Sequence, residues 1–530
     1  MAWMMTQCIA LLVTAPILHV RAAAGPAEQL KVRPAAVAGA FYPADPKELS
    51  TMIDDMLAKA TPGPVDGEIL AAVSPHAGYP YSGPVAAWTY AALKGHKYAR
   101  VVVIAPSHYV GFGFTSVYDG DAYTTPLGTI PVDKEFARRL AKMNSTIELS
   151  DKGHQATADA PEHSVEVELP WLQTVLGHFE LVPIVMGDQS YESSRALGVA
   201  LAKMLRNEHD TLVLASSDLS HYHTYDQAET IDHKTLHALE AWDYLSMSRN
   251  FATQVWEACG GYPIIAAMIA SERLGASHAV VLNYANSGDT AGDKSRVVGY
   301  GAVAFVKNPA RGGAQEPPFA LTLREKDELL RLARKSVETA VHEHKLYDAA
   351  APAAEALNQE RGAFVTLKEH GELRGCIGYI TPMKSLAETV RDVAAYAALE
   401  DSRFKPVTAQ ELPLLEYEIS VMSPLRRVLD IKEIKVGKHG LIMKQGDIEG
   451  ILLPQVPVEE HWNRDTFIQE TCLKAGLPRQ AWKDDDTDIF MFTALVFGVH
   501  LPAETTLPER PTDRSQTPQP SKLGPDSPQP

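Results

Sequence analysis

Short, uninterrupted apolar runs separated by helical patterns are the feature that most constrains the fold of this chain. Four such runs lie at residues 68–73, 99–105, 211–215 and 278–282. A run of this length without polar alternation is typical of a strand buried on both faces of a mainly parallel sheet. Helical patterns fill the intervals, at residues 46–59, 83–93, 165–176, 194–206 and 262–274. The alternation predicts an α/β domain over residues 32–306, with a mainly parallel sheet sandwiched by helices.

A second domain is predicted after a polar segment at 307–319, which is rich in Pro and Gly and is typical of a linker. Residues 320–502 open with an amphipathic helix at 323–340. Strand-like runs follow at 362–368, 415–420 and 490–499. This mixture predicts an α+β domain. The last residues, 503–530, are rich in Pro, Ser, Thr and Gln, which predicts a disordered tail.

The N-terminal residues 1–31 form a segment of their own. An apolar run at 9–20 is followed by small residues at 22–25, as in a secretory signal, but basic residues are missing from its start. The run is too short to cross a membrane comfortably. Two interpretations of residues 1–24 stay open: a cleaved signal of an exported protein, or an over-extended start of a cytoplasmic one. Neither leaves a membrane segment in the mature chain.

Net charge and cysteine spacing disfavour two classes of protein: nucleic-acid binders and disulfide-stabilised proteins. The 530 residues carry a formal net charge of −17, which disfavours the basic surface that nucleic-acid binding needs. The four cysteines, Cys8, Cys259, Cys376 and Cys472, are far apart and form no CxxC pair. A disulfide framework is therefore not expected, and a functional cysteine would act as a thiolate. Cys472 lies in a helical run and is predicted to be a small core residue.

Groups able to bind a metal or a proton follow three of the predicted strands. His76 follows the first run, His108 the second, and Asp218 with His221 the third. Open α/β sheets build their sites beyond the carboxyl ends of the strands, so these side chains are expected to meet. One isolated histidine is more often a surface or satisfied core residue. Three histidines at equivalent positions after three strands favour a common metal-binding or proton-transfer site.

The spacing of the remaining candidate site residues leaves an alternative interpretation open for each. Cys259 lies in a glycine turn before a predicted helix, whose dipole would favour the thiolate; a buried structural cysteine is the alternative. His163 precedes a helix, where it belongs either to the site or to a capping region. His223 competes with His221, which we prefer because it comes sooner after the strand.

Six motifs, in this order along residues 33–306, resemble those of the Memo family. They are Ser74-Pro-His-Ala-Gly-Tyr-Pro-Tyr-Ser-Gly83, Pro106-Ser-His108, Glu162-His-Ser-Val-Glu166, Ser216-Ser-Asp-Leu-Ser-His221, Cys259-Gly260 and Tyr284-Ala-Asn-Ser-Gly-Asp289. Bacterial and archaeal relatives are known as protein B of the AmmeMemoRadiSam system. The fold resembles the class III extradiol dioxygenases, which hold non-haem Fe(II) with two histidines and a carboxylate.

The resemblance implies a metal site in which a cysteine takes the carboxylate position. The implied ligands are His76, His108 and Cys259. His221 matches the catalytic histidine of the dioxygenases, His163 matches another pocket histidine, and Asp218 would set the tautomer of His221. Fe(II) is the first choice of metal, but a thiolate also suits Cu or Zn. Because the ligand set differs, dioxygenase activity does not transfer with the fold.

The second region resembles the AMMECR domain. The resemblance rests on Leu373-Arg-Gly-Cys-Ile-Gly378, with Asp401-Ser-Arg-Phe404 and Glu416-Tyr-Glu-Ile-Ser420 following. The two glycines predict a tight turn or a close approach to the backbone. Arg374 would lower the pKa of Cys376 and make it nucleophilic; alternatively, Cys376 packs in the core and Arg374 caps a turn.

Three functions follow as hypotheses. The leading one is a Memo-like, metal-dependent redox enzyme with a His/His/Cys site. The second is a non-catalytic module that binds a peptide or small molecule in a cleft containing Tyr79 and Tyr81. The third is metal storage or chaperoning. The chain has no CxxxCxxC motif, so it is not itself a radical-SAM protein. The system's name suggests such a protein as a partner.

Overall fold

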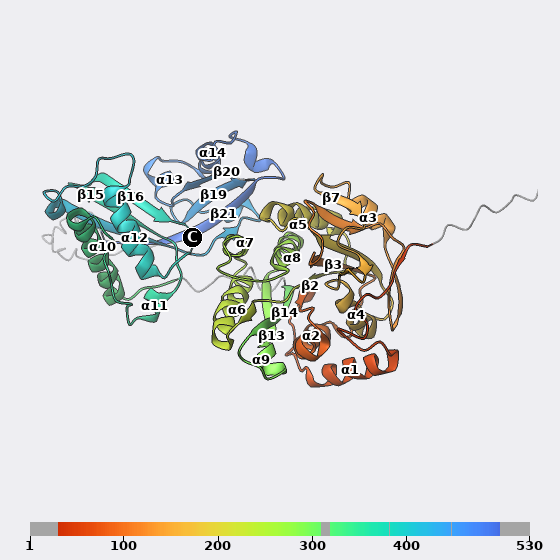
Figure 1. Ribbon diagram of the computed structural model, residues 1–530. Helices are drawn as coiled ribbons and strands as arrows, with labels where there is room; N and C mark the ends of the chain where they lie inside the picture. The colour runs from red at the N-terminus through yellow and green to blue at the C-terminus, as the bar shows by residue number, and fades with distance from the viewer. Residues whose placement is uncertain (1–29, 309–318, 381, 447, 499–530) are drawn as a thin grey trace, which may run out of the picture.

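The computed structural model describes residues 30–308, 319–380, 382–446 and 448–498. They form two bodies that lie side by side (Figure 1). The signal-like segment at 1–24, the linker between 309 and 318, and the predicted tail at 503–530 lie outside the described residues. In the described part of the chain, no helix combines the length and apolarity that crossing a bilayer requires.

The first body is organised by a sheet that, in the described residues, has nine strands. In spatial order these are β12 (His221–His223), β14 (Val297–Lys307), β2 (Glu68–Ser74), β11 (Thr211–Ser216), β3 (Arg100–Pro106), β10 (Glu180–Met186), β4 (Thr115–Tyr118) and β7 (Ile147–Ser150), with β13 (His278–Asn286) on β14. Smaller sheets comprise β1 (Val32–Arg33), β5 (Ala122–Thr125) and β6 (Gly128–Pro131), and the pair β8 (Ala156–Thr157) and β9 (Ala160–Pro161).

The prediction of a mainly parallel sheet is wrong, because the sheet is mixed. Strands β2, β11, β3 and β10 run parallel, but β14 joins β2, and β4 joins β10, in the antiparallel sense. The run at 278–282 is the clearest error. It belongs to β13, which pairs antiparallel with β14, and most of its residues are only half-buried. An apolar run indicates burial but not strand direction.

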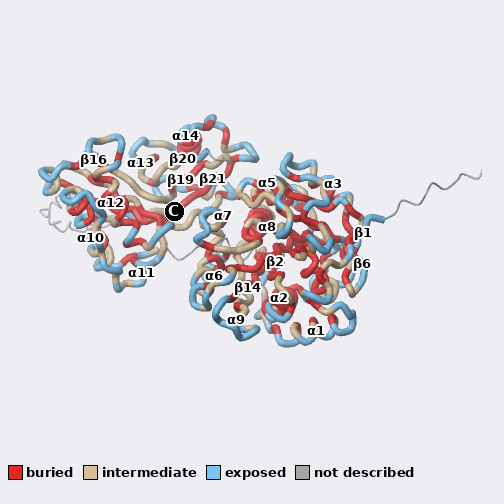
Figure 2. Tube along the Cα trace, viewed as in Figure 1, coloured by how far each residue is buried: buried red, intermediate tan, exposed pale blue. Residues whose placement is uncertain are grey.

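Helices cover both faces of this sheet, as predicted. They are α1 (Pro46–Lys59), α2 (Tyr79–Leu93), α3 (Lys134–Leu140), α4 (Leu169–Leu176), α5 (Tyr191–Leu205), α6 (Tyr225–Glu240), α7 (Tyr244–Ala252), α8 (Gly261–Leu274) and α9 (Ser287–Thr290). Alternate residues of each central strand enter different cores: Val102 packs in the core with α5 and α8, and Val103 in the core with α1, α2 and α4. The central strands and α8 are accordingly buried (Figure 2).

Local signals explain where α1 begins and which face it buries. The side chain of Asp45 accepts hydrogen bonds from the backbone N–H groups of Lys47 and Glu48, and Pro46 occupies the first turn. Leu49, Ile53 and Leu57 follow at four-residue intervals and are buried. Both ends of this helix match the predicted range.

The second body has a seven-stranded sheet within the described residues, and all its pairings are antiparallel. Its strands are β15 (Ala363–Glu369), β16 (Glu372–Tyr379), β17 (Leu415–Met422), β18 (Arg426–Arg427), β19 (His439–Gln445), β20 (Ile448–Leu452) and β21 (Asp488–Phe497). Its helices are α10 (Leu323–Glu343), α11 (Glu355–Asn358), α12 (Leu386–Leu399), α13 (Val456–Glu459) and α14 (Arg464–Lys474). Cys472 is fully buried, as predicted.

Gly375 shows the close backbone approach that its motif predicted, and its substitution is the first test of the fold. A Cβ atom there would overlap the carbonyl oxygen of Ala397 in α12. Gly375→Ala is therefore expected to lower the free energy of unfolding by about 1–3 kcal/mol in a denaturant titration. Gly63→Ala, with open space around it, is the control. Equal stability of both variants would contradict this account of the packing.

Candidate metal centre

Three neighbouring strands end at the same edge of the sheet and carry the candidate side chains at equivalent positions. Ser216 of β11 pairs with Ser74 of β2, and Ala215 pairs with Ile104 of β3. His76, Asp218 and His108 each lie two residues beyond the last residue of their strand. Strand order therefore brings Asp218 to the same edge as two histidines that lie more than a hundred residues earlier in the sequence.

His76 and Cys259 lie in direct contact. The Nε2 atom of His76 is 3.2 Å from the Sγ atom of Cys259. Asp218 completes this side of the site, because its backbone N–H points at the same sulfur, 3.3 Å away. His76, Asp218 and Cys259 each offer a ligand atom, and these atoms lie within 4.8 Å of one another. The expected contact between a strand-end histidine and the distant thiol is present.

Three histidines form a second group that shares His76. Ligand atoms of His76, His108 and His163 lie within 4.8 Å of one another. The rings of His108 and His163 stack with centroids 4.6 Å apart, and the His76 ring meets that of His108 edge-on at 5.1 Å. His163 thus lies with the implied ligands rather than in a separate capping region. The implied set of His76, His108 and Cys259 is spread over the two groups, with His76 common to both.

Hydrogen-bond partners at the Nδ1 atoms of His76 and His108 favour the tautomer that leaves Nε2 free to bind a metal. Nδ1 of His76 lies 2.8 Å from Oγ of Ser216, which in turn lies 2.7 Å from a carboxylate oxygen of Glu168. Nδ1 of His108 lies 3.0 Å from Oε1 of Glu162. If both Nδ1 atoms carry the proton, each Nε2 keeps a lone pair. Hydrogen bonds of this kind orient histidine ligands in metal proteins.

These supporting acids were missed by the sequence reasoning. Glu162 also accepts the backbone N–H of His108 at 2.6 Å and that of His163 at 2.9 Å. Burial alone would raise its pKa, but the hydrogen bonds from His108 and the neighbouring backbone lower it to about 2. Glu168 accepts hydrogen bonds from the hydroxyls of Tyr90 and Ser216, but burial outweighs them and raises its pKa to about 7. The available signal was the run of acidic and apolar residues at 162–168, since buried acids need partners.

Burial lowers the pKa of two site histidines, His76 and His163. It lowers the pKa of His76 well below its usual range, and the nearby rings of His108 and His163 add to the effect. Burial, followed by the charge of His108, lowers the pKa of His163 to about 4. Nδ1 of His163 is buried without a hydrogen-bond partner. A neutral ring with an unsatisfied buried nitrogen fits a metal ligand better than a capping residue.

Two sequence expectations about this site need correction. Burial, and then the charge of Asp218, raise the pKa of the Cys259 thiol above its usual value and outweigh the backbone N–H groups of Asp218 and Gly260, which favour the thiolate. Asp218 does not orient His221 either. Its Oδ1 accepts the backbone N–H of His76 at 2.9 Å, whereas Nδ1 of His221 lies 2.8 Å from the carbonyl oxygen of Leu219.

The two histidines of β12 have different surroundings. His221 is partly buried, and burial lowers its pKa. Nε2 of His223 lies within hydrogen-bond distance of Oε1 of Glu257, 2.8 Å away. Glu257 also accepts the backbone N–H of His221, at 3.3 Å. His223 therefore has a structural partner, which favours His221 as the candidate for proton transfer.

Tyr79 is not a cleft residue, contrary to the second functional hypothesis. Its ring is fully buried, and its hydroxyl donates to the carbonyl oxygen of Val167. Tyr81, by contrast, is 49% exposed. The exposed rings of Tyr109 and Tyr222 lie beside His163 and His221, with centroids 6.2 and 5.7 Å apart. Exposed aromatic surface is thus present next to the histidines.

Comparison with known proteins decides the family. A family model described as Memo-like protein matches residues 33–304, just over half of the chain. The chain belongs to the Memo-like family. A second model, described as AMMECR1, matches residues 330–497. Both resemblances drawn from the motifs are therefore confirmed.

The relatives match the Memo region almost over their whole length. The MEMO1 family protein MK0963 of Methanopyrus kandleri is 38% identical over 286 residues, covering 52% of this chain and 98% of the relative. The MEMO1 family protein MTH_45 of Methanothermobacter thermautotrophicus is 38% identical over 278 residues, covering 51% and 98%. Among solved structures, a crystal structure of the uncharacterised protein PH0010 from Pyrococcus horikoshii is 40% identical with a TM-score of 0.31; the match covers 32% of this chain, a smaller share than the Memo relatives cover, and 88% of that chain.

In the AMMECR domain, Arg374 supports a loop rather than Cys376. Its Nε donates to Glu411 at 2.8 Å, and its Nη1 to the carbonyl oxygen of Lys405 at 3.0 Å. The Cys376 sulfur accepts a hydrogen bond from the Thr366 hydroxyl at 3.3 Å. These contacts favour the alternative in which Arg374 caps a turn. A nucleophilic Cys376 stays a prediction.

Residues of two AMMECR motifs meet at the edge strand β16. The backbone N–H of Cys376 donates to Asp401 at 2.9 Å, and Arg403 donates to the carbonyl oxygen of Cys376 at 3.2 Å. Arg403 and Asp401 also form an ion pair with each other. Edge strands expose unpaired backbone groups, and this pair satisfies those of Cys376. The two motifs thus have a structural explanation.

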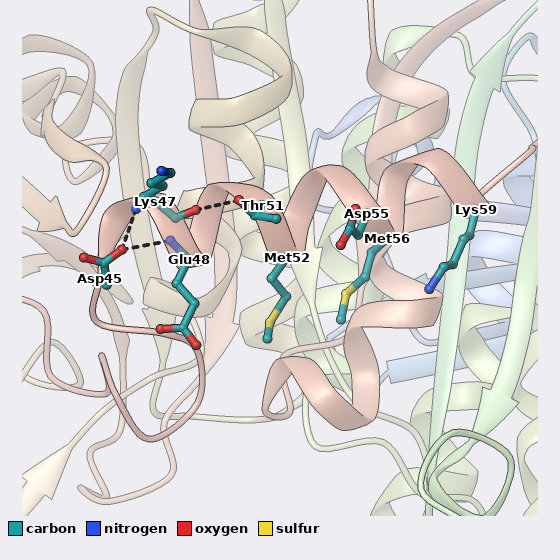
Figure 3. A pocket seen from close by; sticks show the side chains of 8 residues that line it. All are labelled: Asp45, Lys47, Glu48, Thr51, Met52, Asp55, Met56 and Lys59. Atoms are coloured by element: carbon teal, nitrogen blue, oxygen red, sulfur yellow. Dashed lines mark hydrogen bonds between the residues drawn. The ribbon is translucent and has the colours of Figure 1, made fainter.

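A hollow along α1 is not a candidate site. Its lining residues all come from the end and the outer side of that one helix, and the dashed contacts are the cap made by Asp45 and a bond within the helix (Figure 3). Apart from Met52 and Met56, which pack partly against the core, these side chains are on the solvent-facing side of an amphipathic helix. The Memo histidines do not line it.

Replacing Glu162 tests whether the hydrogen-bond partner of His108 contributes to metal binding. Glu162→Gln keeps the size of the side chain but replaces one accepting oxygen by an NH₂ donor. Losing such a partner costs about 10–100-fold in metal affinity, and that reduction is expected here. Competition with a chromophoric chelator measures it, with Glu180→Gln, at the exposed start of β10, as control. An affinity equal to that of the control would contradict the role given to Glu162.

Proposed function

We propose that this chain is a metal-dependent enzyme whose Memo domain binds one transition-metal ion. With Fe(II), the first choice, or with Cu it would be a redox enzyme; with Zn, the remaining alternative, it would act through a Lewis acid. The observation that carries the proposal is the contact between His76 and Cys259, beside His108 and His163, whose backbone N–H groups both donate to the buried Glu162. His76, His108, His163 and Cys259 would hold the ion. Imidazole and thiolate ligands suit Fe, Cu and Zn.

The donor set fits such an ion by its chemistry. His76 is buried, the pKa values of His76 and His163 are lowered, and Nδ1 of His163 is buried without a hydrogen-bond partner. A thiol whose proton is held tightly by burial would give that proton up to a metal, since binding deprotonates the ligand. Bound iron or copper would supply one-electron chemistry, and bound zinc would supply a Lewis acid.

His221 is the residue proposed to move a proton. Its Nδ1 is occupied by the Leu219 carbonyl oxygen, so the neutral ring presents Nε2 as the basic atom. Asp218 holds the backbone of His76 and Ala77, which fixes the position of the neighbouring ligand. In this proposal Asp218 orients His76, and His221 accepts or returns a proton at Nε2.

Oxygen consumption tests the catalytic part of the proposal. The full chain is loaded anaerobically with Fe(II) and then mixed with oxygen and a panel of catechols and other aromatic compounds. Turnover that is lost in His221→Ala but kept in His237→Ala, a histidine near the end of α6, would support the enzyme. If the chain binds metal without turnover, and the bound metal exchanges rapidly with a chelator, storage or chaperoning would be favoured instead.

Ligand binding without turnover is the second candidate function. The exposed rings of Tyr109 and Tyr222 beside the site histidines favour it, because aromatic side chains supply contact area for a peptide or small molecule. Saturable binding of a panel compound that leaves the compound unchanged would support this role. A radical-SAM protein stays a predicted partner, and its absence from specific co-purifying proteins would count against it.

A further inference from the structure

Contacts between the two domains centre on one buried carboxylate. Asp488, the first residue of β21, is only 3% exposed and belongs to the AMMECR domain. Its Oδ2 accepts from Arg195 of α5 at 2.6 Å, and its Oδ1 accepts from Arg273 of α8, also at 2.6 Å. Arg427 of the AMMECR domain donates to Oδ1 at 2.9 Å. A single carboxylate therefore links two Memo helices to the second domain.

The surroundings of this carboxylate are also shared between the domains. Arg427 reaches Glu272 of α8 at 3.9 Å, and Glu272 accepts the hydroxyl of Tyr244 at 3.3 Å. The charges of Arg195, Arg427 and Arg273 outweigh burial and lower the pKa of Asp488. Charged groups so little exposed are stable only when they are paired. The Memo surface supplies two of the three cations.

Apolar side chains around the ion pairs belong to a single core that crosses the domain boundary. Phe490 and Phe492 of β21 are 2% exposed and pack in one cluster with Tyr244 and Met247 of α7. The rings of Tyr244 and Phe490 have centroids 6.1 Å apart. Fixed domain arrangements require an interface with a substantial hydrophobic part, and this contact has one. β21 lies next to α5 and α7 (Figure 1).

We propose that the α5–α7–α8 face of the Memo domain is a specific docking surface for the AMMECR domain, so that the two domains stay bound when the chain between them is cut. Complementary charges and apolar side chains identify the AMMECR domain as the occupant of this surface. Two Memo arginines meet Asp488, and Tyr244 and Met247 meet Phe490 and Phe492. The linker then raises the local concentration of the partner, but it is not what holds the domains together.

Cutting the folded chain tests the proposal. A protease site is inserted between residues 309 and 318 of the full chain, and the purified protein is cleaved and passed over a sizing column at low micromolar concentration. The two fragments are expected to elute together as one species. Separate elution of the unmutated fragments would overturn the proposal.

Two aspartates that both face α5 provide a matched comparison. Asp488→Asn leaves Arg195 and Arg273, whose side chains are little exposed, without their carboxylate partner and is expected to weaken the complex of fragments by roughly 100-fold or more. Asp485 pairs with Lys203 at 2.7 Å but is 79% exposed, so Asp485→Asn is expected to weaken it less than about fivefold. Equal affinities of the two variants would overturn the role of Asp488. If Asp488→Asn gives no folded chain, Arg195→Gln tests the same contact from the Memo side, with the same two outcomes.

Discussion

Replacing His76 with alanine is expected to reduce the affinity of the Memo domain for Fe(II), Cu(I) or Zn(II) by more than about 100-fold. Loss of a residue that only supports a ligand already costs about 10–100-fold, and a direct ligand contributes more. His76 is the residue common to both groups of candidate ligands. Its Nε2 atom lies 3.2 Å from the Cys259 sulfur. No other single side chain in the proposed site connects as many of its members.

Chelator competition under anaerobic conditions measures this effect. His178→Ala, which removes an exposed histidine at the end of α4, is the control for nonspecific binding by imidazole. His76→Gln, closer in size to the native residue, separates loss of a ligand from collapse of the buried site. If all three variants bind metal as the native chain does, His76 is not a ligand. If none of the proteins, native chain included, binds metal, the proposed function is rejected.

The second large effect is expected at Arg33, where alanine should lower the free energy of unfolding by about 3–5 kcal/mol. Arg33 forms an ion pair with Glu166 at 2.7 Å, and their side chains are 3% and 0% exposed. Removing the guanidinium leaves the Glu166 carboxylate buried without its cation. Arg33 also donates to the carbonyl oxygens of His154 and Glu162, so it holds the loop that carries Glu162 and His163.

Denaturant unfolding of the full chain measures the loss, with Lys31→Ala as the matched control. Lys31 also pairs with an acid, Asp151, but both side chains are about half exposed. An exposed pair of this kind contributes about 0–1 kcal/mol. A loss at Arg33 no larger than that at Lys31 would show that the buried pair does not anchor the loop.

The sequence predicted which side chains lie together at the strand ends better than it predicted the topology of the sheet. Apolar runs marked the central strands. The motifs contained the candidate site residue that lies two positions after the end of each strand. Strand direction was not visible, because a strand such as β13 can be apolar in either orientation. The antiparallel neighbours on both sides of the parallel centre follow from the paths of the connections, which the local pattern does not encode.

The immediate surroundings of each ligand were also beyond the sequence. Spacing could bring His108 to the sheet edge, but not assign Glu162, which lies more than fifty residues later, as its hydrogen-bond partner. The same limit explains the error at Asp218, which lies near His221 in the sequence yet supports His76. For Arg374 the neighbouring cysteine suggested a chemical role, whereas its partners lie in the loop at 405–411.

Anomalous diffraction from crystals of the anaerobically loaded chain tests the central claim most directly. The account predicts one strong peak at the absorption edge of the bound metal. That peak should lie about 2.0–2.4 Å from the Cys259 sulfur and from the Nε2 atom of His76. A fully occupied ion out of reach of that sulfur, or a loaded crystal with no ion at the ends of β2 and β3, would contradict it.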